Sequence, residues 1–563
     1  MRNSLLVSLA ALAISLGACA NTRAPVEVET GNPFGSYLSA RVASAQHDLA
    51  TAAKLYRASL DGDPTNPEIA NRAFLYTAAA GDVDGAIDLA NKVVANSPDD
   101  RAARLALAIG ALKQGDYSDA RTQLSQSAKG PFTTLTLSLV NAWASVGAGD
   151  YDAALKQIDA SKAEGGSDPL AAFHRALILD LAGRDGDADA AYQQALQLTN
   201  SGPRVVEAYG RFLERHDRAA DARALYEKIG TDDTLAPIAK EGLARLAAGT
   251  KPDRLVNTPQ AGAAEGLFTI AASLTDATSA DIAILYLRFA LYLNPDFDMA
   301  KIVLADRFEA LKKFEDAIAV YRSVDAASAY APAVAIQIAV DEGRLDRKDE
   351  AIADLKKIAD THQDDLSVWS SLGDAYRADS KDEDAIAAYT HAIKLLNPPT
   401  KKDWPLFFAR AASEQNLKNW TDAETDLKTA LKLSPDEPQV LNFLGYSWVD
   451  QGRNLPEALA MLEKARALSP YDGYIVDSVG WAYYRLKRYQ DAATTLEAAV
   501  LLVPGDSTIN EHLGDAYWMA GRRLDARFQW NHALAFGPDP KAKVELERKL
   551  KDGLDAAQAG GGD

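Results

Sequence analysis

Small residues recur along the chain with a period of 34 residues, and this is its strongest pattern. The period is marked by Ala52, Ala86, Ala120, Ala154, Ala188 and Ala222, then by Ala283, Ala317, Ala351 and Ala385, and with small insertions by Ala423, Ala458, Ala492 and Ala526. Another small residue often lies twelve positions earlier, such as Gly480, and a proline often lies twelve positions later, such as Pro504. Small residues let antiparallel helices approach closely, and proline ends a helix because it cannot continue the hydrogen-bond ladder. The pattern predicts an all-α chain of repeated helix pairs.

The copy at residues 366–399 shows the pattern most clearly. Its small and large positions are Trp369, Leu372, Gly373, Tyr376, Ala385, Tyr389 and Ala392. With these residues it resembles the tetratricopeptide repeat (TPR) family. Other copies are degenerate, and Phe74 replaces the small residue in one of them. The resemblance covers nearly all of 33–538 and implies a superhelical solenoid of about 14 helix pairs.

The register breaks once, between Ala222 and Ala283, where the step exceeds the period. We expect a helix near 235–248 there, followed by a turn-rich segment at 249–262. The predicted organisation is an array of six repeats over 33–230, a joint over 231–263 and an array of eight repeats over 264–538. Residues 539–563 are expected to form a helix that caps the last apolar face, and a disordered tail.

The N-terminus carries an apolar run from Leu5 to Gly17 that ends at Cys19, the one cysteine of the chain. The run is shorter than the roughly 20 residues that cross a bilayer, but it has the form of a signal peptide. Residues 16–19 resemble the lipobox of bacterial lipoproteins, whose cysteine is acylated and becomes the mature N-terminus. The resemblance implies a signal peptide over 1–18, a lipid such as palmitate on Cys19, and a flexible tether over 19–32. The alternative is an ordinary signal peptide with an incidental buried cysteine.

The residue after the cysteine bears on location. In Gram-negative lipoproteins an Asp there means retention in the inner membrane, and this chain has Ala20. The resemblance therefore implies an outer-membrane protein that is lipid-anchored and faces the periplasm.

The amino-acid composition argues against further classes of protein. The 563 residues include 60 Lys and Arg against 79 Asp and Glu, a formal net charge of −19, and 47% hydrophobic residues. The hydrophobic content argues against a disordered chain. The acidic balance argues against nucleic-acid binding, which needs clustered basic residues. An anionic membrane would repel such a body, so we expect membrane attachment through lipid.

Residues that could carry chemistry are scattered. The seven histidines include no pair three or four positions apart, the spacing of a helical metal site. The segment from Asp61 to Asp63 begins like a calcium loop, but Asn66 and Arg72 occupy the positions that need Gly and Glu. We therefore predict no catalytic residue, no metal site, no cofactor and no enzymatic activity.

Aromatic residues gather in the last third of the chain, where seven of the eight tryptophans lie at or after Trp369. In the helix near 473–486, one stripe suits packing and a second falls on the face that the TPR family turns toward its groove. The candidate partner groove consists of Tyr446, Tyr474, Asp477, Trp481, Tyr484, Trp518 and Met519. Partly exposed Trp and Tyr commonly anchor protein interfaces. The alternative is that these rings pack between neighbouring helices.

A second groove motif of the family is not reproduced. Its chaperone-binding subset uses Lys, Asn and Arg to hold a C-terminal carboxylate. The corresponding positions here are Tyr37, Arg41, Asn71, Leu75, Leu105 and Ile109.

Three functions remain open. The layout, and the block from residue 444 to 538, resemble outer-membrane TPR adaptors that bring cell-wall hydrolases to a periplasmic carboxyl-terminal processing protease. The alternative is a structural subunit of an envelope machine for polysaccharide export, pilus assembly or β-barrel insertion. The third, an enzyme fused to repeats, is disfavoured because no segment has room for a catalytic domain.

Overall fold

The computed structural model describes residues 32–163, 168–200, 202–230, 236–276 and 279–554. These residues form helices α1 to α30 and no strand, so the predicted all-α class is confirmed. None of the helices within these ranges is long and apolar enough to cross a bilayer. Cys19, the predicted signal peptide and nearly all of the predicted tether lie outside the described residues.

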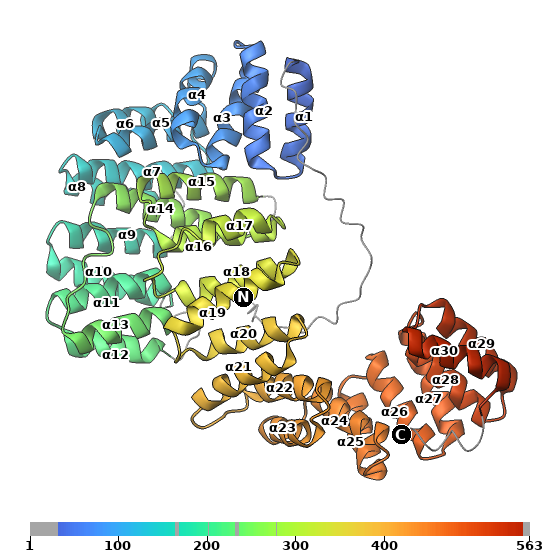
Figure 1. The fold of residues 1–563 in the computed structure, drawn as a ribbon. Helices are drawn as coiled ribbons and strands as arrows, with labels where there is room; N and C mark the ends of the chain where they lie inside the picture. The colour runs from blue at the N-terminus through green and yellow to red at the C-terminus, as the bar shows by residue number, and fades with distance from the viewer. Residues whose placement is uncertain (1–31, 164–167, 201, 231–235, 277–278, 555–563) are drawn as a thin grey trace. The chain divides into compact units, whose positions relative to one another are not determined.

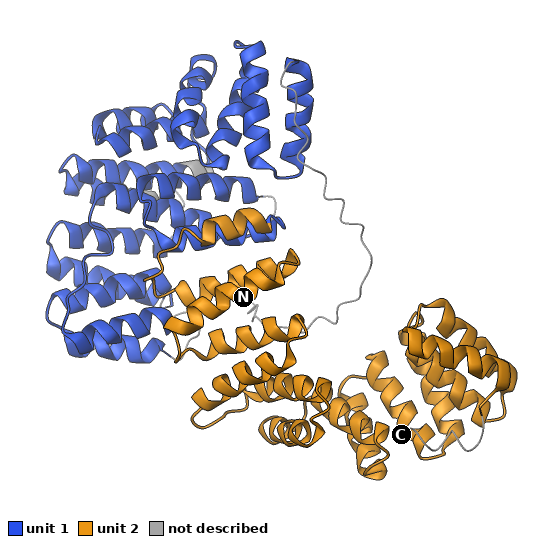
Figure 2. Ribbon diagram, in the orientation of Figure 1, with its two compact units in different colours: residues 1–313 blue, residues 314–563 orange. Residues whose placement is uncertain are grey.

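The chain divides into two compact units, Met1–Lys313 and Phe314–Asp563 (Figure 2). The helices of unit 1 are α1 (Pro33–Ala45), α2 (Leu49–Gly62), α3 (Pro67–Ala80), α4 (Val83–Asn96), α5 (Arg101–Gln114), α6 (Tyr117–Ser125), α7 (Pro131–Gly147), α8 (Tyr151–Ala163), α9 (Asp168–Leu181), α10 (Asp185–Leu198), α11 (Pro203–Arg215), α12 (Ala219–Ile229), α13 (Ala236–Ala248), α14 (Pro259–Ser273), α15 (Ala280–Leu293) and α16 (Asp298–Ala310).

Unit 2 continues the series of paired helices. They are α17 (Phe314–Tyr321), α18 (Ala331–Arg344), α19 (Lys348–Thr361), α20 (Leu366–Ala378), α21 (Asp382–Leu395), α22 (Trp404–Asn416), α23 (Trp420–Leu433), α24 (Pro438–Asp450), α25 (Leu455–Leu468), α26 (Gly473–Arg485), α27 (Tyr489–Leu502), α28 (Ser507–Met519), α29 (Arg523–Ala535) and α30 (Pro540–Asp552).

The small residues of the 34-residue register allow the two helices of a pair to pack closely. Every alanine that marks the register is buried. Gly373 on α20 lies against the ring of Tyr389 on α21, and Gly514 on α28 lies against Trp530 on α29. A Cβ added at Gly373 would come within 2.5 Å of the Tyr389 ring. The expectation that small residues permit close helix approach is therefore confirmed.

The turn inside a pair needs a left-handed residue. Gly81 and Gly115 adopt φ values of 104° and 79°, and each is followed by an aspartate that caps the next helix. The Asp82 carboxylate, for example, accepts a hydrogen bond of 2.9 Å from the backbone N–H of Gly85. In unit 2 the left-handed position is held by residues such as Lys487, with φ 63°.

Helices α14 and α15 do more than extend the series, because they fold back across earlier helices of unit 1. α14 packs against α7 and α9, and α15 packs against α3 and α5 (Figure 1). The side-chain amide of Gln260 donates to the carbonyl of Leu112, and the Lys113 ammonium donates to the carbonyl of Tyr292. The predicted joint over 231–263, which includes α13, therefore lies inside unit 1.

Ion pairs hold the turn-rich end of that joint in place. The buried Asp180 carboxylate on α9 accepts from Arg254 at 3.1 Å and from Arg215 on α11 at 2.6 Å. The Tyr192 hydroxyl also donates to it, at 3.2 Å. Val256, two residues beyond Arg254, is buried. These contacts direct the chain from α13 back toward the earlier helices.

The close approach at Gly373 gives a test of the packing. Gly373→Ala should lower the free energy of unfolding by about 1 to 3 kcal/mol, because the new methyl group overlaps the Tyr389 ring. Gly343→Ala on α18 is the matched control, since a Cβ there meets no heavy atom within 4 Å. It should be neutral or stabilising by up to about 1 kcal/mol. Urea unfolding followed by helical circular dichroism measures both, and equal losses would contradict this account.

Candidate functional site

The candidate groove residues lie on three first helices of successive pairs in unit 2. Tyr446 is on α24, four of the residues are on α26, and Trp518 and Met519 are on α28. Capping aspartates set where two of these helices begin: Asp472 accepts backbone N–H groups of α26, and Asp506 accepts one of α28. Because α24 packs against α26 and α26 against α28, all seven residues belong to one run of adjoining helices.

Trp481 connects two of these helices through its ring. It stacks on Tyr484 of its own helix, with ring centroids 4.6 Å apart and planes inclined by 8°. It also stacks on His512 of α28, at 4.1 Å and 14°. Tyr484 is buried, whereas Trp481 remains half-exposed. A large part of the Trp481 ring surface therefore serves packing between repeats.

Asp477 lies behind this stack and pairs with the same histidine. Its two carboxylate oxygens lie 2.9 and 3.0 Å from Nδ1 of His512, and both side chains are buried. Burial alone would lower the pKa of His512, but Asp477, with Asp515 and Glu511 farther off, raises it above its usual value. The pair therefore joins α26 and α28, and it favours the protonated form of the imidazole. Burial and the Asp450 and Asp477 carboxylates raise the pKa of Tyr446 to about 12.

Trp518 is covered in part by the C-terminal end of the chain. Its indole N–H donates to the carbonyl of Leu554 at 2.9 Å, and a Cβ on Gly553 would overlap its ring. Its other neighbours are Trp530, 5.4 Å away between ring centroids, and the guanidinium of Arg523, 5.1 Å from its ring centroid. Trp518 therefore helps to seat the helix that ends the described chain.

A buried lysine also holds α30 against α28. The ammonium of Lys549 on α30 lies 2.7 Å from Asp515 and 2.6 Å from Glu511, both on α28. Burial alone would lower the pKa of Lys549, but these two carboxylates raise it. The sequence indicated a capping helix here but gave no sign of its partners, because a lysine in a charged helix resembles any solvent-exposed lysine.

The predicted groove residues thus differ in how far their side chains are exposed to solvent. Asp477 and Tyr484 are buried, whereas Tyr446, Trp481, Trp518 and Met519 are half-exposed. Tyr474 is 42% exposed, and Tyr471, in the turn before α26, is 86% exposed. We call Tyr446, Tyr471, Tyr474 and Trp481 the aromatic face of unit 2. Tyr471 was missed because its position in a turn falls outside any helical stripe.

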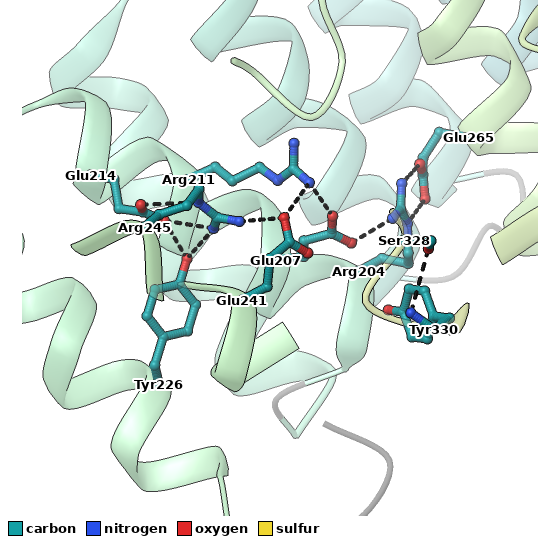
Figure 3. Close-up of polar contacts among 10 residues, drawn as sticks. All are labelled: Arg204, Glu207, Arg211, Glu214, Tyr226, Glu241, Arg245, Glu265, Ser328 and Tyr330. Atoms are coloured by element: carbon teal, nitrogen blue, oxygen red, sulfur yellow. Dashed lines mark hydrogen bonds and ion pairs between the residues drawn. The ribbon is translucent and has the colours of Figure 1, made fainter. Parts of the chain in front are cut away.

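In unit 1, α14 packs against the first helices α7 and α9, and α15 packs against α3 and α5. A buried charge also joins α14 to α11. Glu265 on α14 is almost fully buried and receives two hydrogen bonds, of 2.9 and 2.6 Å, from the guanidinium of Arg204 on α11. Arg204 also forms an ion pair with Glu207, and Glu207 forms another with Arg211 (Figure 3). The sequence did not reveal the buried partner of Arg204, because Glu265 lies on another helix, 61 residues further along the chain.

Further along α11 the same kind of contact joins α12 and α13. Arg245 on α13 pairs with the buried Glu214 at 2.8 Å and with Glu241 at 2.5 Å. The Tyr226 hydroxyl donates to Glu214 at 2.7 Å (Figure 3). The buried carboxylates of Glu214 and Glu265 thus each have a guanidinium partner, as burial of charge requires.

An aromatic pair packs beneath α14. The indole N–H of Trp143 donates to Nδ1 of His174 at 3.0 Å, and both side chains are buried. Burial lowers the pKa of His174 to about 3, so its imidazole is neutral. Gly262 on α14 lies directly against the Trp143 ring, where a Cβ would overlap it. This position therefore requires glycine for close packing.

One cavity, of about 600 Å³, lies in unit 1 between α3 and α15. It is lined by Leu49, Pro67, Glu68, Asn71, Arg72, Leu75, Tyr76, Ala79, Ser97, Asp281, Ile282 and Leu285. Asn71 and Leu75 occupy positions of the chaperone-type clamp, whereas Leu105 and Ile109 on α5 are buried. A cavity of this size can hold a small ligand or a few peptide side chains.

Comparison with known families agrees with the repeat pattern. A tetratricopeptide-repeat profile matches residues 37–101, 139–203, 408–473 and 480–542, and a second profile with the same description matches 77–129. Together with the paired helices, these matches define the chain as a tetratricopeptide-repeat protein with an all-α superhelical fold.

Two curated relatives match over short segments. The TPR repeat-containing protein PA4667 of Pseudomonas aeruginosa is 31% identical over 146 residues, which are 26% of this chain and 24% of that protein. The cytochrome c-type biogenesis protein CycH of Rhizobium meliloti is 33% identical over 104 residues, 18% of this chain and 27% of that protein. The chain thus spans about a quarter of each relative's length.

Solved structures of similar fold are distant in sequence. The Cut9–Hcn1 hetero-tetramer of the APC/C is 16% identical with a TM-score of 0.37, over 93% of this chain and 96% of that chain. A tetratricopeptide repeat protein from Parabacteroides merdae is 14% identical with a TM-score of 0.37, over 45% and 97%.

The Asp477–His512 bridge predicts a pH-dependent stability. Because the folded pKa of His512 is raised above 6.5, the bridge contributes fully below pH 6.5, and its contribution is lost as the pH rises through the folded pKa. Asp477→Asn should destabilise the protein by about 1 to 3 kcal/mol at pH 6 and flatten this profile. Thermal melting between pH 5.5 and 9 measures it.

The control replaces a histidine without a buried partner. His532→Gln, at an exposed position on α29, should leave the profile unchanged. An Asp477→Asn variant with the wild-type pH profile would show that His512 is not charged in the folded protein.

Proposed function

We propose that this protein is a lipid-anchored, non-catalytic adaptor that binds partner proteins at the aromatic face of unit 2. The observation that carries the proposal is a contrast between the two units. In unit 1 the first helices α3, α5, α7 and α9 pack against α14 or α15. Within the described part of unit 2, no helix from elsewhere packs across α24 and α26 in that way. Exposed tyrosines and a half-exposed tryptophan on α26 and the turn before it provide rigid, amphipathic contact area for a protein partner.

The anchor in this proposal is Cys19, in the lipobox-like sequence. Two or three acyl chains, at about 0.8 kcal/mol per buried CH₂, hold a protein firmly on a bilayer. Ala20 after the cysteine favours the outer membrane, with the repeats facing the periplasm. In this arrangement the repeats hold partners near the membrane.

The partners in this proposal are a periplasmic carboxyl-terminal processing protease and its cell-wall hydrolase substrates. Its support is the resemblance in layout to adaptors of that kind, together with the uncovered aromatic face. The alternative is a structural subunit of an envelope machine for polysaccharide export, pilus assembly or β-barrel insertion. The match to CycH, a protein named for cytochrome c biogenesis, supports this alternative role in assembly.

Lipid attachment is tested by metabolic labelling. Cells that express the protein with labelled palmitate should incorporate the label into the wild-type chain but not into Cys19→Ser. That variant should also leave the membrane fraction after membranes are washed with high salt. A wild-type chain without label would contradict the lipid anchor, whatever the partners are.

Partner binding is tested by removing exposed rings. Tyr471→Ala with Tyr474→Ala should weaken partner binding at least about tenfold, because both side chains are exposed anchors. The melting temperature should stay unchanged. The measurement is recovery of the protease and hydrolase from cross-linked, detergent-solubilised envelopes, followed by titration with the purified protease.

The matched control removes apolar surface from second helices of the same unit. Leu501 on α27 and Leu524 on α29 are each 84% exposed, so Leu501→Ala with Leu524→Ala should retain full binding. Equal loss in both variants would exclude the aromatic face as the binding site. Recovery of barrel or export subunits in place of a protease would support the alternative.

A further inference from the structure

Helix α1, the first described helix, carries an apolar stripe toward solvent. Phe34, Leu38 and Val42 follow one another at intervals of four residues, so they lie along one side of the helix. Their side chains are 83%, 62% and 58% exposed. Three large apolar side chains in a row form a continuous exposed surface, unlike a single exposed leucine.

The described helices do not cover this stripe. The opposite side of α1, with Ser36, Ala40 and Ala43, is buried against α2. Tyr37, between the two sides, donates a hydrogen bond to Glu68 of α3 at 3.0 Å. Among the described helices, α2 is the one against which α1 packs extensively. The stripe is therefore available to something outside the described residues.

The charge of α1 itself suits an anionic surface. α1 carries a single charged side chain, the exposed Arg41, and no carboxylate, although the whole chain has a net charge of −19. The nearest acidic residues in sequence are Glu27 and Glu29 before the helix and Asp48, which caps α2, after it. The exposed side of α1 thus combines apolar side chains with one cation, as interfacial helices do.

The position of α1 in the chain selects the membrane among the possible occupants. Residues 20–32 connect Cys19 to the start of α1. A segment of this length reaches at most about 45 Å when fully extended, and a flexible one averages about 20 Å. A lipid on Cys19 would therefore keep α1 close to the bilayer surface at all times. The tether would give α1 a high effective concentration at the bilayer, so that even a weak contact with lipid forms.

We propose that α1 lies along the membrane surface, with Phe34, Leu38 and Val42 inserted among the lipid headgroups and Arg41 near their phosphates. This inference rests on the proposed lipid anchor at Cys19. The contact orients unit 1 at its first helix, in addition to the tether. The acidic remainder of the chain is held away, because an anionic leaflet repels it.

The test places a polarity-sensitive probe on the stripe. The chain from residue 20 onward carries a hexahistidine tag in place of Cys19, which binds it to vesicles of phosphatidylethanolamine and phosphatidylglycerol containing nickel-chelating lipid. Leu38→Cys then supplies a sole cysteine for a nitrobenzoxadiazole label. We expect its emission to shift to the blue on binding and its reduction by dithionite to slow at least about fivefold. Leu524→Cys, at a control site that is even more exposed than position 38, should show neither change.

Each other outcome overturns the proposal. Unchanged emission at position 38 on anchored protein would mean that α1 stays in water. A blue shift that appears in solution as the protein concentration rises would assign the stripe to a second copy of the chain. A shift seen equally at position 524 would indicate non-specific adsorption. Because the tag replaces the natural lipid, failure here leaves the palmitate experiment intact, and failure of that experiment does not alter this result.

Discussion

The close approach of two helices at small residues is the constraint on which the fold depends. The register alanines are buried, and glycines such as Gly373 and Gly514 lie against large rings. Such contacts stack short helices into units although none of them would be stable alone in water. Because each repeat buries only its faces toward its neighbours, the first helices are left with a side that must be covered or remain in solvent.

The two units meet this requirement differently. In unit 1, α14 and α15 cover the first helices α3, α5, α7 and α9, and α14 is also held by the buried Arg204–Glu265 pair and by the glycine that admits the Trp143 ring. A buried ion pair contributes little net stability compared with apolar packing, but removing one partner is costly. The pair therefore disfavours other placements of α14. In unit 2 the equivalent side retains exposed and half-exposed aromatic rings.

Some aromatic rings of unit 2 pack between helices, and others are exposed to solvent. Trp481 and His512 stack between α26 and α28, and Asp477 pairs with the histidine and raises its pKa. This bridge fixes the spacing of the two first helices and so positions Tyr474, whose ring remains 42% exposed. The two interpretations of the aromatic stripe thus apply to different residues: Asp477 and Tyr484 are packed, whereas Tyr474 is accessible. The role of the accessible rings in binding stays a prediction.

The sequence by itself determined the helices, their pairing and the small residues between them. These depend on contacts between residues about 12 to 34 positions apart, so side-chain size and periodicity record them directly. It also indicated which helix carries the aromatic stripe. Only the tertiary structure decided that α14 and α15 cover unit 1, that α30 seats against Trp518, and which aromatic rings stay exposed. Contacts such as that of Lys113 with Tyr292 join residues 179 positions apart. Such contacts follow from the complementarity of whole surfaces, which no local pattern encodes.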